Sequence, residues 1–236
     1  MTVEEEQPLS VVIVGATGGL GRPIAERLSQ SGALLTLVGR DRDRLNALGL
    51  AGHVMATDIR KVGAAQRVMQ EALARHGRVD GVVFAAGAVA FGTIEDTSDD
   101  VVIDLFTLNT LAPIRLLHAA LPALRVSAAQ GRHPFVVNIS AVVAEQPQPG
   151  MAAYSASKAA LAAYDAAAAR ELRREGIRLI DARPPHTETG LADRPLAGTA
   201  PRLPTGLAAD AVAQRIVDAI HLGEKDLPSS AFTSST

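Results

Sequence analysis

The chain has 236 residues, of which 47% are hydrophobic and 20% charged, and its formal net charge is −2. This length suits one α/β domain with a large core, and the balanced charge gives no electrostatic footprint for nucleic acid or an anionic membrane. The chain has no cysteine, which excludes disulfides and thiolate chemistry, and its six histidines lack ligand spacing, so we expect no metal.

The chain begins with an acidic stretch, residues 2–7, that does not have the pattern of a signal peptide. No apolar run approaches the ~20 residues that span a bilayer. We therefore expect a cytoplasmic protein, and its abundant alanine with few aromatic residues suggests a bacterial source. The core is expected over about 9–222, and the composition of the two tails permits disorder.

Apolar runs and helical spacing predict strands that alternate with helices. In chain order they are strand 9–14, helix 20–30, strand 33–38, helix 41–48, strand 53–56, helix 60–76, strand 81–85, helix 99–125, strand 135–139, helix 152–175, strand 177–182 and helix 208–221. Pro113 and Pro122 are positions where the helix 99–125 could break. The alternation predicts a Rossmann-like, doubly wound parallel α/β sheet of about six or seven strands, with helices on both faces in three layers.

No linker, repeat or change in composition divides the chain, so we expect one domain over residues 1–236. The irregular stretch is 184–206, which is rich in proline. A long loop of this kind in a compact domain is a lid, a binding loop or a mobile segment. We expect it to border the substrate.

A glycine-rich turn joins the first predicted strand to the first predicted helix. Its glycines fit two spacings, G-x-x-x-G-x-G and G-x-x-G-x-x-G, and the strict G-x-G-x-x-G fingerprint is absent. A helix N-terminus at this place offers free N–H groups to a pyrophosphate, although such a turn can also serve packing alone. We expect the turn to bind a dinucleotide through Gly15, Thr17, Gly18, Gly19, Leu20 and Gly21.

The end of the second predicted strand bears on the choice of dinucleotide. An acidic residue there would bind the ribose 2′-OH of NAD, whereas an arginine accommodates the 2′-phosphate of NADP. Arg40 stands at this place, which favours NADP(H) over NAD(H). Asp41 follows and could turn back towards the ribose.

Tyr154 and Lys158 are four residues apart on the longest predicted helix, so they share a face about one turn apart. A phenol ionises near ~10, and a neighbouring cation favours the phenolate. The pair therefore has the makings of an acid/base group.

These features, in this order, resemble the classical branch of the short-chain dehydrogenase/reductase family. The resemblance extends from about residue 10 to about residue 221. The matching segments are the turn 15–21, Asp58-Ile59, Ala86-Gly87, Leu108-Asn109-Thr110, Asn138-Ile139-Ser140-Ala141, 154–158 and 184–189. The extended branch, with its sugar-nucleotide epimerases, fits less well because only about fifty residues follow the last predicted strand.

The resemblance implies four catalytic residues. Tyr154 would be the general acid or base, and Lys158 would bind the nicotinamide ribose and lower the phenol pKa. Ser140 would orient the substrate oxygen, and Asn109 would hold a water in a proton relay. The alternatives are a strand-end cap for Ser140 and a structural role for Asn109.

The resemblance also implies further cofactor contacts. Asp58 and Ile59 would contact adenine, although Asp58 could instead cap the next helix. Ala86 and Gly87 would leave room for the cofactor. The remaining contacts would come from the segment after the last strand, namely Pro184, Thr187 and Thr189.

That segment departs from the family pattern, because Pro185 stands where the family has glycine. A proline fixes φ, so the backbone there should be stiffer and the contact of Thr189 less certain. His186 and Glu188 are polar groups that could touch substrate or lie in solvent.

The sequence therefore predicts an NADP-dependent oxidoreductase that reduces a ketone or aldehyde, or oxidises the alcohol. The alternative is a non-catalytic dinucleotide sensor or scaffold on the same fold. The expected pocket wall, 88–93, 142–151 and 191–203, is mostly apolar, with Glu145, Gln146 and Arg194 as orienting groups. It suggests a medium-sized apolar carbonyl compound, and the family's habit implies a homodimer or homotetramer.

Overall fold

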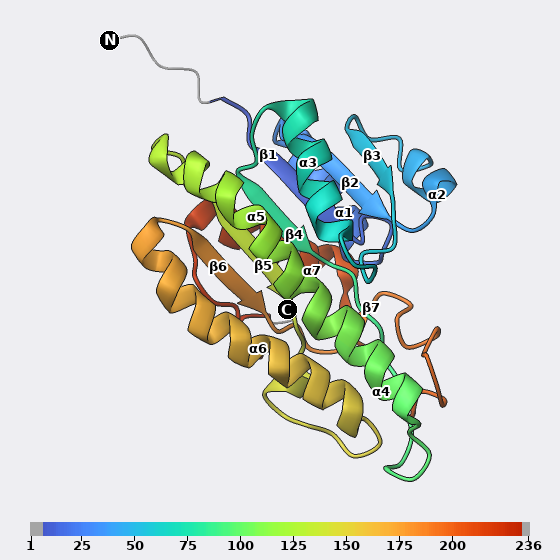
Figure 1. Cartoon of the computed structure of the whole chain (residues 1–236). Coiled ribbons are helices and arrows are strands. Elements are labelled where there is room, and N and C mark those ends of the chain that lie inside the picture. The colour runs from blue at the N-terminus through green and yellow to red at the C-terminus, as the bar shows by residue number, and fades with distance from the viewer. Residues whose placement is uncertain (1–6, 233–236) are drawn as a thin grey trace.

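The computed structural model describes residues 7–232. Its centre is one six-stranded parallel sheet with the order β3-β2-β1-β4-β5-β6 (Figure 1). The strands are β1 (Ser10–Val14), β2 (Leu34–Gly39), β3 (His53–Ala56), β4 (Gly81–Phe84), β5 (Phe135–Ile139) and β6 (Arg178–Ala182). This order reverses direction at β1 and β4, as in a doubly wound Rossmann-like fold, and confirms the predicted α/β class.

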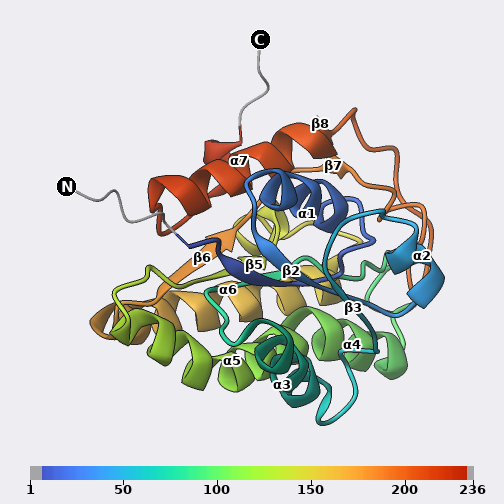
Figure 2. The ribbon, with the colours of Figure 1, turned by 90° about the horizontal axis from the view of Figure 1, so that it is seen from above.

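Helices cover both faces of the sheet, which Figure 2 shows from above. One layer contains α1 and α7, and the other contains α3, α4, α5 and α6. The helices are α1 (Gly21–Gln30), α2 (Arg42–Asn46), α3 (Ala64–His76), α4 (Asp99–Phe106), α5 (Ala112–Ala129), α6 (Ala152–Leu172) and α7 (Ala209–Leu222). Each layer has its own core because successive side chains of a strand point to opposite faces. On β1, Val11 and Ile13 belong to the core on the α1 and α7 side, and Val12 and Val14 to the other.

Two predicted helices differ from the structure. The helix predicted over 60–76 begins only at Ala64, because Gly63 precedes it in the left-handed conformation with φ +77°. The helix predicted over 99–125 does not break at either proline. It runs from α4 through a π-helical turn, Thr107–Leu111, into α5, whose first turn accommodates Pro113.

This continuous run, Asp99–Ala129, is also the most membrane-like part of the described chain. By length and composition it could cross a bilayer. A window of 18 residues within it has a mean hydropathy of 1.3, and 39% of that window is buried. The sequence predicts no apolar run long enough to span a bilayer, and this helix corrects that expectation. Because a core helix of a non-membrane protein passes the same test, one such run is weak support for a span.

The proline-rich segment 184–206 is anchored at both ends. At its base, β7 (Thr187–Glu188) pairs with β8 (Leu207–Ala208) in a small parallel sheet. Further along, the Leu196 N–H donates to the Val89 carbonyl at 2.8 Å, and the Phe91 N–H donates to the Ala197 carbonyl at 2.9 Å. These bonds hold the segment across the chain that leaves β4.

The C-terminal segment is more ordered than its composition suggested. Leu227 forms a parallel bridge with Ala182, beside β6. Ser229–Ala231 then make a 3₁₀ turn, and Phe232 is buried in the α1 and α7 core. The expectation of disorder is therefore wrong for residues 229–232, because one aromatic side chain finds a place in the core. The other tail residues, 1–6 and 233–236, lie outside the described residues.

Candidate active site

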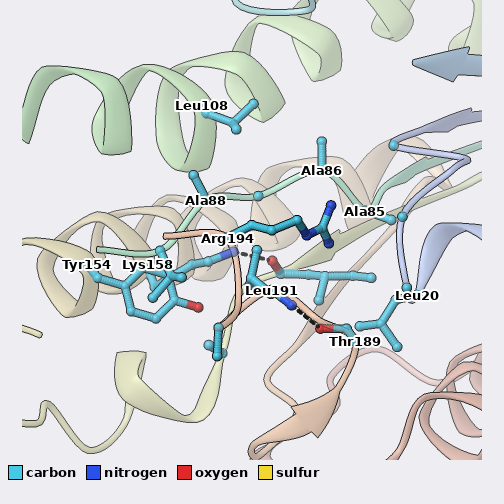
Figure 3. Close-up of a pocket in the computed structure, with 18 of the residues that line it drawn as sticks. Leu20, Ala85, Ala86, Ala88, Leu108, Tyr154, Lys158, Thr189, Leu191 and Arg194 are labelled. Atoms are coloured by element: carbon cyan, nitrogen blue, oxygen red, sulfur yellow. Dashed lines mark hydrogen bonds between the residues drawn. The ribbon is translucent and has the colours of Figure 1, made fainter. Parts of the chain in front are cut away.

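A cavity of about 980 Å³ opens at the carboxyl ends of the strands, where ligands bind in open α/β sheets. It extends from the glycine turn and the end of β2 to the first turns of α6 and the segment 184–206. Figure 3 shows the part of this wall that contains Leu20, Tyr154, Lys158 and Thr189. Of the predicted site residues, it is lined by Gly15, Thr17, Gly18, Gly19, Leu20, Arg40, Asp58, Ile59, Ala86, Gly87, Ser140, Tyr154, Lys158, Pro184, Thr187 and Thr189. Gly21 and Asn109 lie behind this surface.

The glycine turn is packed too closely for any side chain at three positions. A Cβ on Gly15, which has φ +84°, would stand 2.6 Å from the Ala86 nitrogen. A Cβ on Gly21 would stand 2.1 Å from the Gly15 carbonyl oxygen, and one on Gly19 would stand 2.5 Å from the Thr189 Cβ. The turn therefore touches both the chain after β4 and the base of the segment 184–206.

The N-terminus of α1 suits an anion such as a pyrophosphate. No side chain among the described residues caps it, and its first turn contains no acidic residue. Within the first turn, the N–H groups of Arg22 and Ile24 already donate to the carbonyls of Gly18 and Leu20, and Pro23 has no N–H. The N–H groups of Gly19 and Leu20 just before the helix, together with the positive end of its dipole, are what the turn offers to a ligand. The cradle thus fits the phosphates of a dinucleotide.

The far end of the cavity is lined by charged side chains of both signs, namely Arg40, Arg44, Arg60, Asp41, Asp58 and Asp104. The Arg44 side chain reaches the Thr17 carbonyl at 3.4 Å. Asp41 caps α2, since its Oδ1 accepts from the N–H groups of Asp43 and Arg44 at 3.0 and 3.1 Å. One oxygen of this carboxylate is therefore engaged in its own helix, while Asp41 still lines the cavity.

Asp58 is bound to Arg60 rather than to the following helix. The guanidinium donates to both carboxylate oxygens, with the shortest distance 2.8 Å from Nη2 to Oδ2. The hydrogen bond from Arg60 holds the pKa of Asp58 below its usual value. Helix α3 starts at Ala64, after Gly63, so Asp58 does not cap it.

Tyr154 and Lys158 lie side by side in the cavity wall, on the first turns of α6 (Figure 3). Burial raises the pKa of Tyr154 to about 12 and lowers the pKa of Lys158 to about 8. The Lys158 ammonium donates to the Ile139 carbonyl at 2.8 Å, the dashed line that leaves it in Figure 3. The expected lowering of the phenol pKa is therefore not found here, because desolvation dominates and the ammonium is directed to the backbone.

Ser140 follows β5 and reaches the cavity, and its hydroxyl donates to Asp181 on β6 at 2.5 Å. Asn109 sits in the π-helical turn and holds the chain after β4: its Nδ2 donates to the Ala88 carbonyl and its Oδ1 accepts from the Ala88 N–H, both at 2.9 Å. A Cβ on Gly87 would lie 3.5 Å from the Asn109 Oδ1 and 3.6 Å from the Lys158 Nζ. Asn109 of the π-helical turn and Lys158 of α6 therefore approach the same glycine.

Comparison with known proteins supplies the family. Residues 10–197 match the family model described as short chain dehydrogenase. The chain belongs to the short-chain dehydrogenase family. Members of this family are oxidoreductases.

Relatives and solved structures agree with this assignment. The chain is 31% identical to dehydrogenase/reductase SDR family member 7B of Mus musculus, over 95% of this chain and 74% of the relative. It is 27% identical to an uncharacterized oxidoreductase of Staphylococcus epidermidis, over 92% and 94%. A short-chain dehydrogenase from Sphingobium yanoikuyae in complex with NADPH superimposes with a TM-score of 0.81 at 28% identity, covering 93% and 87% of the two chains.

In this short-chain dehydrogenase, some side chains that were expected to contact the substrate bind other parts of the chain instead. Glu188 accepts the Gly206 N–H at 2.7 Å, whereas His186 lines the cavity. Glu145, expected to orient a substrate, instead binds Arg183 and Ser229. Pro184 accepts the Val142 N–H at 3.0 Å, so the stiff Pro-Pro segment is fixed to the chain after β5.

Sequence reasoning missed several charged residues near the site. Arg44 and Arg60 line the end of the cavity next to β2. Asp165 and Asp181 are buried beneath Ser140 and Lys158. The available signal was an aspartate inside an apolar strand and another inside an alanine-rich helix, since carboxylates are almost never fully buried without a partner.

Proposed function

We propose that this short-chain dehydrogenase transfers hydride between NADP(H) and a carbonyl or alcohol substrate. The observation that carries the proposal is the burial of Tyr154 and Lys158 together in the wall of a cavity that continues to an uncapped helix N-terminus. An acid/base group and an anion cradle in one cavity fit a reaction in which a dinucleotide and a polar bond meet.

Bound NADPH would supply the hydride. The phenol of Tyr154, with its pKa near 12, is protonated at neutral pH and can donate its proton to the carbonyl oxygen of a substrate. Lys158 would bind the ribose hydroxyls, Ser140 would donate to the substrate oxygen, and Asn109 would join the proton relay. The hydrogen bonds of Asn109 to Ala88 support a structural part as well.

For the cofactor we propose NADP(H) over NAD(H). Arg40 and Arg44 offer guanidinium groups at the end of the cavity, and Oδ1 of Asp41 is engaged in capping α2. The remaining cofactor contacts would come from the glycine turn 15–21, from Asp58, Ile59, Ala86 and Gly87, and from Pro184, Thr187 and Thr189. The complex of the Sphingobium relative with NADPH agrees with this choice.

For the substrate we propose a medium-sized, mainly apolar carbonyl compound, held under the segment 184–206 as a substrate loop. Val89, Phe91, Met151 and Leu196 are among the apolar side chains of the cavity wall. We further propose one domain, a cytoplasmic location and a homodimer or homotetramer assembled through helices. Such an interface would cover exposed apolar side chains on α4 and α5, such as Ile103 and Val126.

The experiment is NADPH oxidation across a panel of ketones and aldehydes, with wild type, Tyr154→Phe and Tyr164→Phe. Loss of the proton donor should lower kcat by about 10²- to 10⁴-fold while NADPH binding persists. Tyr164 is the matched control, because it lies on the same helix and bonds only His118 at 3.2 Å, near the surface. Equal rates for wild type and Tyr154→Phe would refute the mechanism, and tight NADPH binding without any turnover would favour the non-catalytic sensor.

A further inference from the structure

Beneath the cavity wall, between β5, β6 and α6, lies a group of buried acids that the proposed chemistry does not use. Asp181 on β6 is 5% exposed and Asp165 on α6 is 1% exposed. Both lie outside the cavity lining, yet both attract the charge of Lys158. A buried carboxylate is costly unless it is paired, so two of them here require a structural or chemical reason.

Asp181 divides its two oxygens between Ser140 and Arg183. Oδ1 accepts the Ser140 hydroxyl at 2.5 Å, and Oδ2 accepts from Nη1 of Arg183 at 2.6 Å. The same guanidinium also binds Glu145 on the chain after β5 and Asp226 on the C-terminal segment. Arg183 therefore fixes the carboxylate of Asp181, and this carboxylate directs the Ser140 O–H bond towards β6.

Asp165 has fewer hydrogen-bond partners than Asp181. Its Oδ1 accepts from Nδ2 of Asn138 at 2.8 Å, whereas its Oδ2 is buried without a hydrogen-bond partner in the part of the chain that the structure describes. Burial, with added repulsion from Asp181, raises the pKa of Asp165 to about 8. The two acids titrate as a pair, and we assign the first ionisation to Asp181, because Ser140 and Arg183 both favour its charged form.

The direction of the Ser140 hydroxyl matters for the proposed reaction. A hydroxyl has one proton to donate, and a carbonyl oxygen that gains negative charge needs donors. While Ser140 donates to an ionised Asp181, its oxygen can only accept from a molecule in the cavity. When Asp181 is protonated, its own O–H can donate to Ser140, and the Ser140 proton can turn into the cavity, where a substrate oxygen competes with the Ala182 carbonyl at 3.4 Å.

We propose that Asp181 is a positioning residue for Ser140. As a carboxylate, Asp181 accepts the hydrogen bond of the Ser140 hydroxyl and keeps it turned away from the cavity. As a carboxylic acid, Asp181 no longer needs this hydrogen bond, and the Ser140 hydroxyl can turn to donate to the substrate oxygen. The inference rests on the proposed carbonyl reduction. No bond between heavy atoms changes, and the proton on Asp181 exchanges with solvent.

The inference gives a signed dependence on pH. Burial raises the pKa of Asp181 above its usual value, so the acid form extends to higher pH than in an exposed aspartate. As pH rises through this pKa, Ser140 loses its role as donor, and kcat/KM for reduction should fall by up to about tenfold per pH unit. The groups that face Asp181 are Arg183, which follows β6, Ser140 after β5, Lys158 and Asp165 on α6, and Asp226 on the C-terminal segment, with Glu145 sharing Arg183.

The first experiment measures this alkaline limb from about pH 5 to about pH 9, with the carbonyl compound that wild type reduces fastest. Asp181→Asn, which keeps the shape of the neutral acid, should lose the limb. Ser140→Ala should lower the rate and also lose the limb, and adding Asp181→Asn to it should change nothing further. A limb that survives in Ser140→Ala belongs to another group, such as Lys158 or Asp165, and overturns the inference.

A second variant guards against misfolding of Asp181→Asn. Asp226 is exposed and its charge opposes ionisation of Asp181, so Asp226→Lys should move the limb to lower pH. Glu71→Lys makes the same charge change on α3, near the opposite edge of the sheet, and should leave the limb in place. An equal shift in both variants, or none in Asp226→Lys, contradicts the inference.

A readout without turnover separates this inference from the proposed function. In protein labelled with ¹³C at the aspartate carboxyl carbons, the Asp181 resonance is the one absent from Asp181→Asn. Its pKa should rise in Ser140→Ala, because the ionised form loses a donor. An unchanged pKa overturns the inference even if carbonyl compounds are reduced, whereas a rise together with no turnover would refute only the proposed function.

Discussion

Arg40 and Asp41 are neighbours after β2, but their side chains serve different ends. Asp41 caps α2 through two backbone N–H groups, and Arg40 lines the end of the cavity. Asp41 therefore has a structural role in its own helix. That role can be read only once the bounds of α2 are known.

At the residue scale we predict that Arg40→Ala weakens NADPH binding by about tenfold to a hundredfold, because a charge-assisted contact to phosphate is lost. Binding of NADH, which lacks that phosphate, should be unchanged. Cofactor fluorescence titration measures both affinities. Arg42→Ala is the control, since Arg42 is exposed nearby and lies outside the cavity lining. Parallel losses for NADPH and NADH would show that Arg40 does not read the phosphate.

The sequence was sufficient for the residues whose position follows from a local pattern. Tyr154 and Lys158 are one helical turn apart by spacing alone, and both do line the cavity. It was insufficient for the ionisation of the pair, because desolvation depends on everything packed around α6. The role of Asp181 could not be predicted either, because its partner Ser140 lies 41 positions away in the chain.

At the scale of elements, the π-helical turn connects three parts of the site. Asn109 in this turn bonds both backbone groups of Ala88 and also donates to the Ser157 hydroxyl on α6 at 3.0 Å. A wider turn places this side chain towards the sheet within an otherwise regular helical run. Propensity alone predicted one helix here, because the widening depends on contacts with two distant segments.

We predict that Asn109→Ala lowers the free energy of unfolding by about 2–4 kcal/mol, since it leaves the buried N–H and C=O of Ala88 without partners. Urea unfolding followed by circular dichroism measures the change. Thr107→Ala, in the same π-helical turn, removes a side chain with none of these bonds and should stay within about 0.5 kcal/mol of wild type. If the two variants are equally stable, the clamp on Ala88 contributes nothing.

At the scale of the whole molecule, the order of the parallel strands determines where the cavity lies, because it brings the carboxyl ends of β1, β4, β5 and β6 to one edge of the sheet. Alternation of strands and helices was enough to predict this architecture. It did not predict the short pair β7 and β8 or the C-terminal segment beside β6. Such short pieces are held by tertiary contacts, and their composition alone resembles a loop or a tail.

The C-terminal segment closes the core on the α1 and α7 side, and Phe232 is its apolar anchor at 7% exposure. We predict that Phe232→Ala lowers the free energy of unfolding by about 3 kcal/mol, because a large buried side chain leaves a cavity. Leu222→Ala is the control: this leucine ends α7, is 75% exposed, and should change stability by at most about 0.5 kcal/mol. Both are measured by urea unfolding. Equal stability of the two variants would mean that the segment is not part of the cooperative core, and the link from Asp226 through Arg183 to the site would then lack a fixed support.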